Sequence, residues 1–170
     1  MKNSKTALVL EGGGSRGMYT AGILELFLEH NIYLDATYAI SSGALYGISY
    51  ISKQPGRNIE VNSYCGDSRY CGVKHLIKSK SYISWDFLLS ELPFNLLPLD
   101  FKTIEQSPNF FVGTSNCITG KADFYKINDL KPKEVATLLQ ASGSLPVISP
   151  MVDYNNNNYL DGGLADSIPF

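Results

Sequence analysis

The chain has 170 residues, of which 44% are hydrophobic and 18% charged, and its formal net charge is -2. This length suffices for one domain with a real core, and the composition is that of a globular protein rather than a disordered chain. Acidic and basic residues are interspersed, so the sequence shows no basic cluster of the kind that binds nucleic acid. No stretch approaches the roughly 20 apolar residues of a membrane-spanning helix. We therefore expect one domain over residues 1–170, with no nucleic-acid partner.

The amino-terminal segment and the cysteines indicate a cytoplasmic protein. The apolar run Ala7–Leu10 is too short for the core of a signal peptide, and Glu11 and the glycines follow at once. Cys65, Cys71 and Cys117 lack C-x-x-C spacing, which disfavours a disulfide framework and a zinc site. We expect Cys117, beside a predicted strand, to be a buried small apolar residue rather than a nucleophile. No cofactor or metal is expected.

The hydrophobic pattern alternates between strands and helices, which predicts an α/β fold with a mostly parallel sheet. The continuous apolar run at residues 6–11 is typical of a strand buried on both faces, and the 3.6-residue period of residues 18–30 predicts a helix. The other expected elements are a strand at 37–40, a helix at 44–52, short helices within 54–80, strands at 109–114 and 122–127, a helix at 132–141, and a hairpin with strands at 151–154 and 159–161.

Residues 82–101 are rich in aromatic and leucine side chains, among them Trp85 and Phe94. Such a stretch invites a lipid-binding interpretation, but aromatic residues beside leucines more often belong to a core. We therefore expect short helices that pack on the sheet, with these side chains in the core.

The first candidate site is the glycine-rich turn after the first predicted strand, with Gly12, Gly13, Gly14, Arg16 and Gly17. Successive backbone N–H groups at the start of a helix bind anionic oxygen. In a hydrolase this oxygen would be the oxyanion of a tetrahedral intermediate, held chiefly by the amides of Gly13 and Gly14. Arg16 would orient the loop or contact a phosphate on the substrate, unless it only forms a surface salt bridge.

The same loop also satisfies G-x-G-x-x-G, the pattern of dinucleotide-binding folds, because a strand precedes it and a helix follows it. Asp35 lies near the distance at which the ribose-binding acid is expected. Only residues 32–34 precede this aspartate as an apolar stretch, which is little for the second strand of such a fold. A dinucleotide-binding module is therefore the alternative function.

The second candidate is a serine between a strand and a helix, and local geometry favours Ser41 over Ser42. A nucleophile elbow is a sharp turn that needs small residues two positions before and two positions after the serine. Around Ser41 these positions hold Ala39 and Gly43, whereas a branched isoleucine stands two positions before Ser42. In the competing interpretation, the two serines only cap the following helix.

The third candidate is Asp161, which Gly162 and Gly163 follow. Alone, this sequence most often marks a turn, but a nucleophilic serine needs a base. Histidine is the usual base, yet neither His30 nor His75 follows Asp161, as the Ser-Asp-His order of α/β hydrolases requires. The sequence thus favours a Ser-Asp dyad and leaves His75 open. A carboxylate of ordinary pKa is a weak base for a hydroxyl, so we expect Asp161 to be partly desolvated.

Together these motifs resemble the patatin-like phospholipase family, which combines a G-G-G-x-R/K-G loop, a G-x-S-x-G elbow and a D-G-G/A aspartate. The resemblance covers nearly the whole chain and is strongest to the bacterial branch. Further matching segments are Val112-Gly113-Thr114-Ser115-Asn116, Thr119-Gly120 and Ala141-Ser142-Gly143-Ser144-Leu145-Pro146. The resemblance implies a three-layer α/β/α fold and a lipid acyl hydrolase that forms an acyl-enzyme. Ser41 would be its nucleophile and Asp161 its base.

The sequence departs from the family pattern in two respects. Ala39 replaces the first glycine of the elbow, a difference of one methyl group. Family members also continue beyond the D-G-G motif, so the resemblance implies that the domain is incomplete at its carboxyl end. It further implies a lipid or ester substrate and peripheral membrane contact. A catalytically inactive patatin-like fragment is a third interpretation, and the sequence leaves the oligomeric state open.

Overall fold

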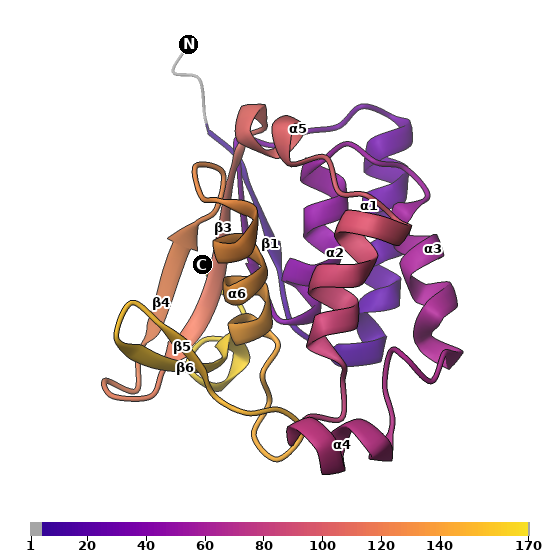
Figure 1. Cartoon of the computed structure of the whole chain (residues 1–170). Coiled ribbons are helices and arrows are strands. Elements are labelled where there is room, and N and C mark those ends of the chain that lie inside the picture. Colours follow the sequence, from indigo (N-terminus) through magenta and orange to yellow (C-terminus); the bar gives the residue numbers. More distant parts are fainter. Residues whose placement is uncertain (1–4, 170) are drawn as a thin grey trace.

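The protein is described by a computed structural model that covers residues 5–169 and contains a six-stranded mixed sheet flanked by helices (Figure 1). Residues 1–4 and 170 of the expected domain lie outside the described residues. The elements in chain order are β1 (Ala7–Leu10), η1 (Gly14–Arg16), α1 (Gly17–Glu29), β2 (Ala36–Ile40), α2 (Ser42–Ile51), α3 (Arg57–Ser63), η2 (Tyr64–Gly66), α4 (Val73–Ser79), η3 (Phe87–Leu96), α5 (Phe101–Gln106), β3 (Asn109–Asn116), β4 (Ala122–Lys126), α6 (Pro132–Ser142), β5 (Val152–Tyr154), β6 (Asn157–Asp161) and η4 (Gly162–Leu164).

The sheet has the strand order β1-β2-β3-β6-β5, and β4 pairs with the other edge of β3. β1, β2 and β3 are parallel, and both β4 and β6 run antiparallel to β3. Because β5 is antiparallel to β6, it points the same way as β3. Four of the six strands (β1, β2, β3 and β5) therefore share one direction, which confirms the predicted α/β class with a mostly parallel sheet.

The predicted elements are present, and their ends differ from the predicted ones by at most two residues. Two short α-helices, α3 and α4, and the 3-10 turn η2 occupy the polar segment 54–80. The hairpin near the carboxyl end is confirmed, and its turn consists of Asn155 and Asn156, with φ angles of 49° and 61°. Two successive left-handed residues form the turn whose twist matches paired strands, and asparagine tolerates this conformation well.

The hydrophobic core lies between the sheet and helices α1, α2 and α6. Helix α1 buries residues 17, 21, 24 and 28, a spacing that places them on one helical face. On the sheet, Leu10, Ala39 and Val112 face these helices and are almost fully buried. The carboxyl ends of β1 and β2 and the amino ends of the helices that follow them therefore meet at one end of the core.

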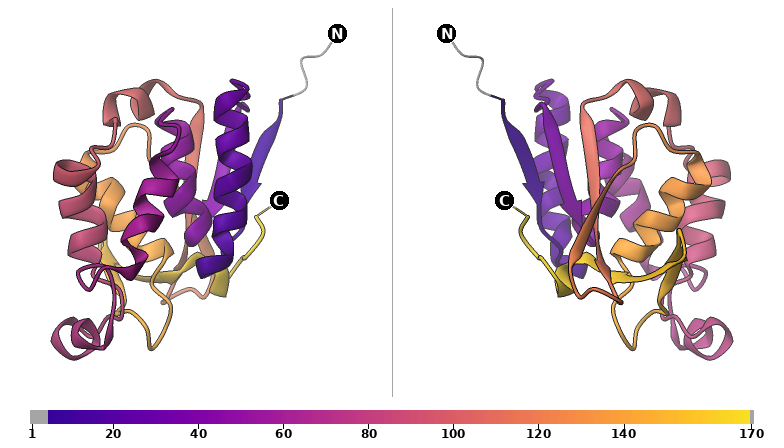
Figure 2. Two further views of the ribbon diagram at one scale, coloured as in Figure 1. Left: turned by 90° about the vertical axis from the view of Figure 1, so that its right-hand side faces the viewer. Right: turned by 90° about the vertical axis from the view of Figure 1, so that its left-hand side faces the viewer.

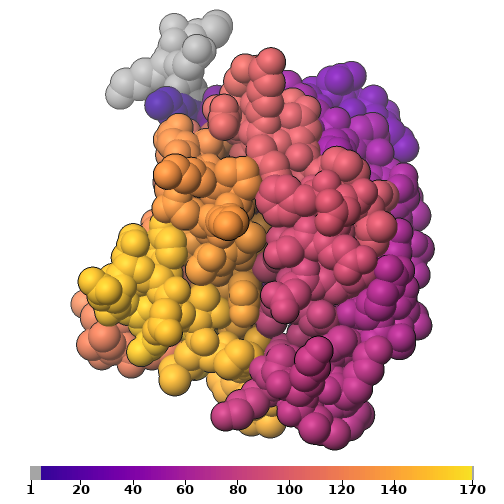
Figure 3. All heavy atoms as spheres, in the orientation of Figure 1, coloured from indigo at the N-terminus to yellow at the C-terminus, as the bar shows by residue number. Residues whose placement is uncertain are grey.

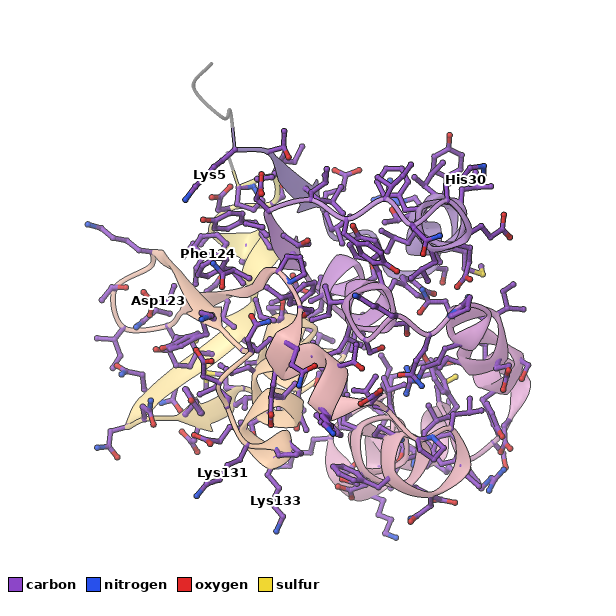
Figure 4. The ribbon with its side chains drawn as sticks, turned by 90° about the horizontal axis from the view of Figure 1, so that it is seen from above. Lys5, His30, Asp123, Phe124, Lys131 and Lys133 are labelled. Atoms are coloured by element: carbon purple, nitrogen blue, oxygen red, sulfur yellow. The ribbon has the colours of Figure 1, made fainter. Side chains whose placement is uncertain are left out.

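The expectation that the first strand is buried on both faces is wrong, because only Leu10 of its four residues is buried. β1 is an edge strand, and the described helices gather on one side of the sheet (Figure 2). On the other side, Tyr38 stacks on Phe111 with ring centroids 4.7 Å apart and meets the edge of Phe124 at 6.0 Å. These three rings are only half-buried, and Figure 4 labels Phe124 on this side.

Two other expectations about burial require correction. In the segment 82–101, Trp85 is buried as expected, whereas the side chain of Phe94 is 46% exposed and stacks on Phe101 at the surface. Half of this segment forms one π-helix, η3, around Pro93. Cys117 is exposed rather than buried, because β3 ends at the preceding residue and the chain turns there toward β4.

Candidate active site

The pairing of β3 brings the two central candidates together. One edge of β3 is shared by two strands: Ile40 at the end of β2 pairs with Gly113, and Asp161 at the end of β6 pairs with the next residue, Thr114. The residue after Ile40 is Ser41. Neighbouring strands lie about 4.8 Å apart, so this register places Ser41 and Asp161 side by side although 120 positions separate them in the chain.

Ser41 lies in a strained turn between β2 and α2. Its φ and ψ angles are 55° and -126°, a conformation that L-residues rarely adopt and that costs about 1–3 kcal/mol. A Cβ atom on Gly43 would approach the carbonyl oxygens of Leu10 and Glu11 to 2.6 Å, so the second small position of the turn requires glycine. Ala39, the first small position, is completely buried and tolerates its methyl group.

The side chain of Ser41 forms a hydrogen bond with the buried carboxylate of Asp161. The hydroxyl Oγ of Ser41 donates to Oδ2 at 2.6 Å, and the N–H of Gly163 donates to Oδ1 at 2.8 Å. Burial raises the pKa of Asp161 above 3.8, and the hydrogen bonds from Ser41 and Gly163 oppose this effect. The expected desolvation of Asp161 is therefore confirmed. A Cβ on Gly162 would collide with the carbonyl oxygen of Gly113, so the turn after the aspartate also requires glycine.

Two serines that had no assigned role hold this arrangement in place. The hydroxyl of Ser142, at the end of α6, accepts the N–H of Ser41 at 2.8 Å and donates to the carbonyl of Gly113 at 2.7 Å. The hydroxyl of Ser115 donates to the carbonyl of Asp161 at 2.7 Å. Both serines belong to the segments that carry the family resemblance. Their hydrogen bonds join different secondary-structure elements, so no periodic pattern in the sequence reveals their role.

The glycine loop packs directly against the serine turn. A Cβ on Gly12 would lie 2.9 Å from the Cβ of Ser41, and one on Gly17 would lie 2.8 Å from the Oγ of Ser42. The backbone N–H groups of Gly13 and Gly14 have no hydrogen-bond acceptor among residues 5–169. The loop therefore offers two unpaired amides close to Ser41, which is the property expected of an anion-binding turn.

Arg16 and Ser42 also belong to this region. Arg16 is exposed, its side chain lies against Gly13, and it forms no salt bridge with a described residue. The surface salt bridge considered for Arg16 is thus not formed. The hydroxyl of Ser42 is buried and has no partner within the described part of the chain, so it does not cap α2.

Ser41 and Gly14 line a cavity of about 490 Å³. Its walls are mainly apolar and come from α2, α6, η3 and the residues just before η3: Leu45, Ile48, Trp85, Leu88, Leu89, Leu92, Val135 and Leu139. Arg57 also contributes, and its guanidinium donates to the hydroxyl of Ser49 and the carbonyl of Leu97, both at 3.1 Å. Burial lowers the pKa of Arg57 to about 10. The volume and the apolar lining are those of a pocket for a small organic ligand.

The structure does not bring the remaining candidates to this site. The carboxylate of Asp35 accepts the N–H of Thr6 at 2.7 Å, before β2, whereas the glycine loop lies beyond the opposite end of the strands. The ring of His75 contacts the carbonyl of Ser68 at 2.9 Å. His30 follows α1 at the upper end of the molecule, which faces the viewer in Figure 4. Neither histidine bonds to Ser41 or Asp161.

With this geometry established, comparison with known proteins identifies the family. The sequence model of the patatin-like phospholipase family matches residues 8–170, and the chain belongs to this family. The chain also resembles VipD from Legionella pneumophila, with a TM-score of 0.56 and 16% identity over 98% of this chain and 47% of that one. This likeness shows the fold alone and agrees with the predicted patatin-like α/β fold with a mostly parallel sheet. Of the layers of the expected three-layer α/β/α arrangement, residues 5–169 contain the sheet and the helices on one side of it (Figure 2).

Curated relatives are more similar in sequence. The uncharacterized protein YjjU of Escherichia coli is 29% identical over 97% of this chain and 47% of its own length. The probable lipid hydrolase 463L of Invertebrate iridescent virus 6 is 30% identical over 95% of this chain and 61% of its own. The lysophospholipase NTE1 of Meyerozyma guilliermondii is 24% identical over 99% of this chain and 12% of its own. The chain thus spans about half the length of YjjU and less of NTE1.

Proposed function

We propose that the protein is a serine hydrolase that cleaves carboxylic esters of lipids through Ser41 and Asp161. The hydrogen bond of 2.6 Å between Ser41 Oγ and Asp161 Oδ2, at the wall of an apolar cavity, is the observation that carries this proposal. Acyl transfer requires a nucleophile that is hydrogen-bonded to a base, and a third group that orients the base. Here the N–H of Gly163 orients the carboxylate.

In the first half-reaction, Oγ of Ser41 forms a bond to the carbonyl carbon of the ester, and its proton passes to Asp161. The negative charge that develops on the carbonyl oxygen rests on the N–H groups of Gly13 and Gly14, which have no other acceptor among residues 5–169. The bond to the leaving alcohol then breaks, and Asp161 returns the proton to the alcohol oxygen. The raised pKa of Asp161 makes this carboxylate a better base than an exposed one.

In the second half-reaction, water replaces the alcohol. Asp161 accepts a proton from the water as its oxygen bonds to the acyl carbon, and the same amides hold the second oxyanion. The acyl–Oγ bond breaks, Ser41 recovers a proton from Asp161, and the carboxylic acid leaves. No metal or cofactor enters either half-reaction.

The apolar cavity favours a substrate with an acyl chain. Polar side chains such as Ser15, Ser42 and Asn62 also line the cavity, but most of its wall is apolar. Binding therefore depends mainly on the burial of hydrocarbon, worth about 25 cal/mol per Å². The printed names of two relatives, a lysophospholipase and a probable lipid hydrolase, support a lipid ester. We accordingly propose that the partner is a lipid substrate, reached by peripheral contact with a membrane. None of the helices in residues 5–169 combines the length and apolar character needed to span one.

Labelling with a fluorophosphonate tests the assignment of the nucleophile. The wild-type chain should be modified, Ser41→Ala should not, and Asp161→Asn should react at least a hundredfold more slowly. Ser42→Ala is the matched control, because it removes a neighbouring hydroxyl that has no partner in the described residues. Modification that persists in Ser41→Ala and disappears in Ser42→Ala would refute the proposal.

Turnover of p-nitrophenyl esters and phospholipids separates the remaining alternatives. A catalytically inactive fragment would turn over neither substrate, whereas an active hydrolase loses turnover with Ser41→Ala. A dinucleotide-binding module would instead bind NAD or FAD in calorimetry, and Ser41→Ala would not change its affinity. The close packing of Gly12 on Ser41 and the position of Asp35 at the far end of the strands weigh against that module.

A further inference from the structure

Helix α4 exposes its apolar side chains to solvent. Val73, Leu76 and Ile77 are 66%, 40% and 82% exposed, and none of the seven residues of the helix is buried. The ring of His75, on the opposite side of the helix, bonds to the carbonyl of Ser68. A surface helix normally turns its apolar face toward the core. Because the apolar side chains of α4 face solvent, its orientation is the reverse of the one that the burial of apolar surface favours.

A second exposed apolar segment lies beside α4. It joins α6 to β5 and includes Leu145, Val147 and Ile148, which are 39%, 93% and 42% exposed. Val147 has a φ angle of 72°, a conformation that is strained for a β-branched residue. The segment thus exposes an aliphatic side chain to solvent at a strained backbone position, and both features are unfavourable for a protein in water.

Hydrogen bonds join the two segments into one surface. The N–H of Tyr82 donates to the carbonyl of Ile148 at 2.7 Å, and the carbonyl of Tyr82 accepts the N–H of Gly72, the residue before α4, at 2.9 Å. Figures 1 and 2 place both segments at the end of the molecule away from the amino terminus, and Figure 3 shows their atoms beside one another there. We name this surface the rim patch, formed by Val73, Leu76, Ile77, Tyr82, Leu145, Val147 and Ile148.

The rim patch is continuous with the cavity at the candidate active site. Tyr82, Leu145 and Ile148 are partly exposed and also line the cavity that contains Ser41. A hydrocarbon chain that leaves the exposed patch can therefore enter the cavity along apolar side chains. This continuity distinguishes the patch from the exposed aliphatic residues that are scattered singly over ordinary protein surfaces.

The charge beside the rim patch is positive although the whole chain carries a net charge of -2. Lys74 and Lys78 on α4 and Lys80 just after it are exposed and form no salt bridge with a described residue. Of the nearby acids, Asp67 and Glu91 are paired with one arginine, Arg69, whereas the exposed Asp86 lines the same hollow as Lys74. Aliphatic side chains flanked by unpaired lysines fit the boundary between the hydrocarbon and the anionic headgroups of a bilayer.

We propose that the rim patch docks the protein on an anionic lipid bilayer and that the substrate passes from the bilayer through the patch into the cavity. The aliphatic side chains of α4 and of Val147 enter the headgroup region, and the lysines contact lipid phosphates. This inference rests on the proposed function for its route to Ser41, but the docking itself requires no catalysis. A second copy of the chain is the competing occupant of the patch.

Vesicle flotation of the Ser41→Ala variant tests the docking without degrading the lipid. The protein should bind phosphatidylcholine vesicles that contain phosphatidylserine more tightly than phosphatidylcholine vesicles alone. Ile77→Glu with Val147→Glu should reduce binding at least tenfold. Lys74→Gln with Lys78→Gln should weaken binding to the anionic vesicles by about 25-fold, at roughly fivefold for each lysine, and raised salt should have the same effect.

Leu26→Glu is the matched control. Leu26 is a 50% exposed aliphatic residue on α1, near the opposite end of the molecule, and its replacement should leave binding unchanged. Melting curves followed by Trp85 fluorescence verify that each variant is folded. Equal binding by the rim-patch variants and the control would overturn the proposal, and so would a rim-patch variant that only converts a dimer to a monomer. Because these readouts need no turnover, vesicle binding by a wild-type chain that shows no ester turnover would refute the proposed function alone.

Discussion

Replacing Ser142 with alanine should destabilise the protein and disorder the turn at Ser41. The hydroxyl of Ser142 is completely buried and holds both the N–H of Ser41 and the carbonyl of Gly113. In the variant, the N–H of Ser41 has no acceptor in the described structure, and the carbonyl loses a donor. A buried polar group that loses its partner costs about 1–3 kcal/mol. For these two groups we expect a loss of about 2–4 kcal/mol in the free energy of unfolding.

Urea-induced unfolding, followed by the fluorescence of Trp85, the single tryptophan, measures this loss. Thr137→Ala is the matched control, since Thr137 lies on the same helix and its hydroxyl donates to the carbonyl of Lys133 at an exposed position. Both substitutions gain similar helix propensity, so their difference isolates the buried hydrogen bonds. We expect Thr137→Ala to remain within about 0.5 kcal/mol of the wild type.

The reactivity of Ser41 provides a second measurement. If Ser142 holds the strained turn, fluorophosphonate labelling of Ser142→Ala should slow at least tenfold under conditions where the variant is fully folded, and Thr137→Ala should label at the wild-type rate. The reasoning would be refuted if Ser142→Ala lost no more stability than Thr137→Ala.

Further outcomes are expected for the pH dependence of activity and for substitutions elsewhere in the chain. The folded-state pKa of Asp161 is raised above 3.8, so kcat/KM should fall with decreasing pH through a midpoint above 3.8. Ionisation of this buried group opposes folding as pH rises through the same window, so Asp161→Asn should unfold at a higher urea concentration than the wild type at pH 7. Gly22→Ala, in open space on α1, should add about 1 kcal/mol of stability, whereas Gly43→Ala should prevent α2 from packing on β1 and yield little folded protein in circular dichroism. Asn156→Gly should raise the melting temperature by a few degrees, because glycine adopts the left-handed turn at lower cost than asparagine.

Local sequence determined much of the scaffold. The spacing of apolar residues in 18–30 and 132–141 fixes helices whose buried faces match the core, because the 3.6-residue period acts within a few turns. The asparagine run fixes a hairpin through the left-handed conformations that asparagine tolerates. The small residues around Ser41 indicate a sharp turn for the same local, steric reason.

Burial and the contacts of the candidate site were decided by the tertiary structure. The first strand has an apolar sequence, but its position at the edge of the sheet leaves most of it partly exposed. The sequence named Ser41 and Asp161, yet only the register of β3 puts them 2.6 Å apart, through pairs with Gly113 and Thr114. Likewise, only the packing of α6 against the sheet gives Ser142 its two partners. Helical periods and turn sterics act between near neighbours in the chain, whereas these contacts depend on which strands and helices meet.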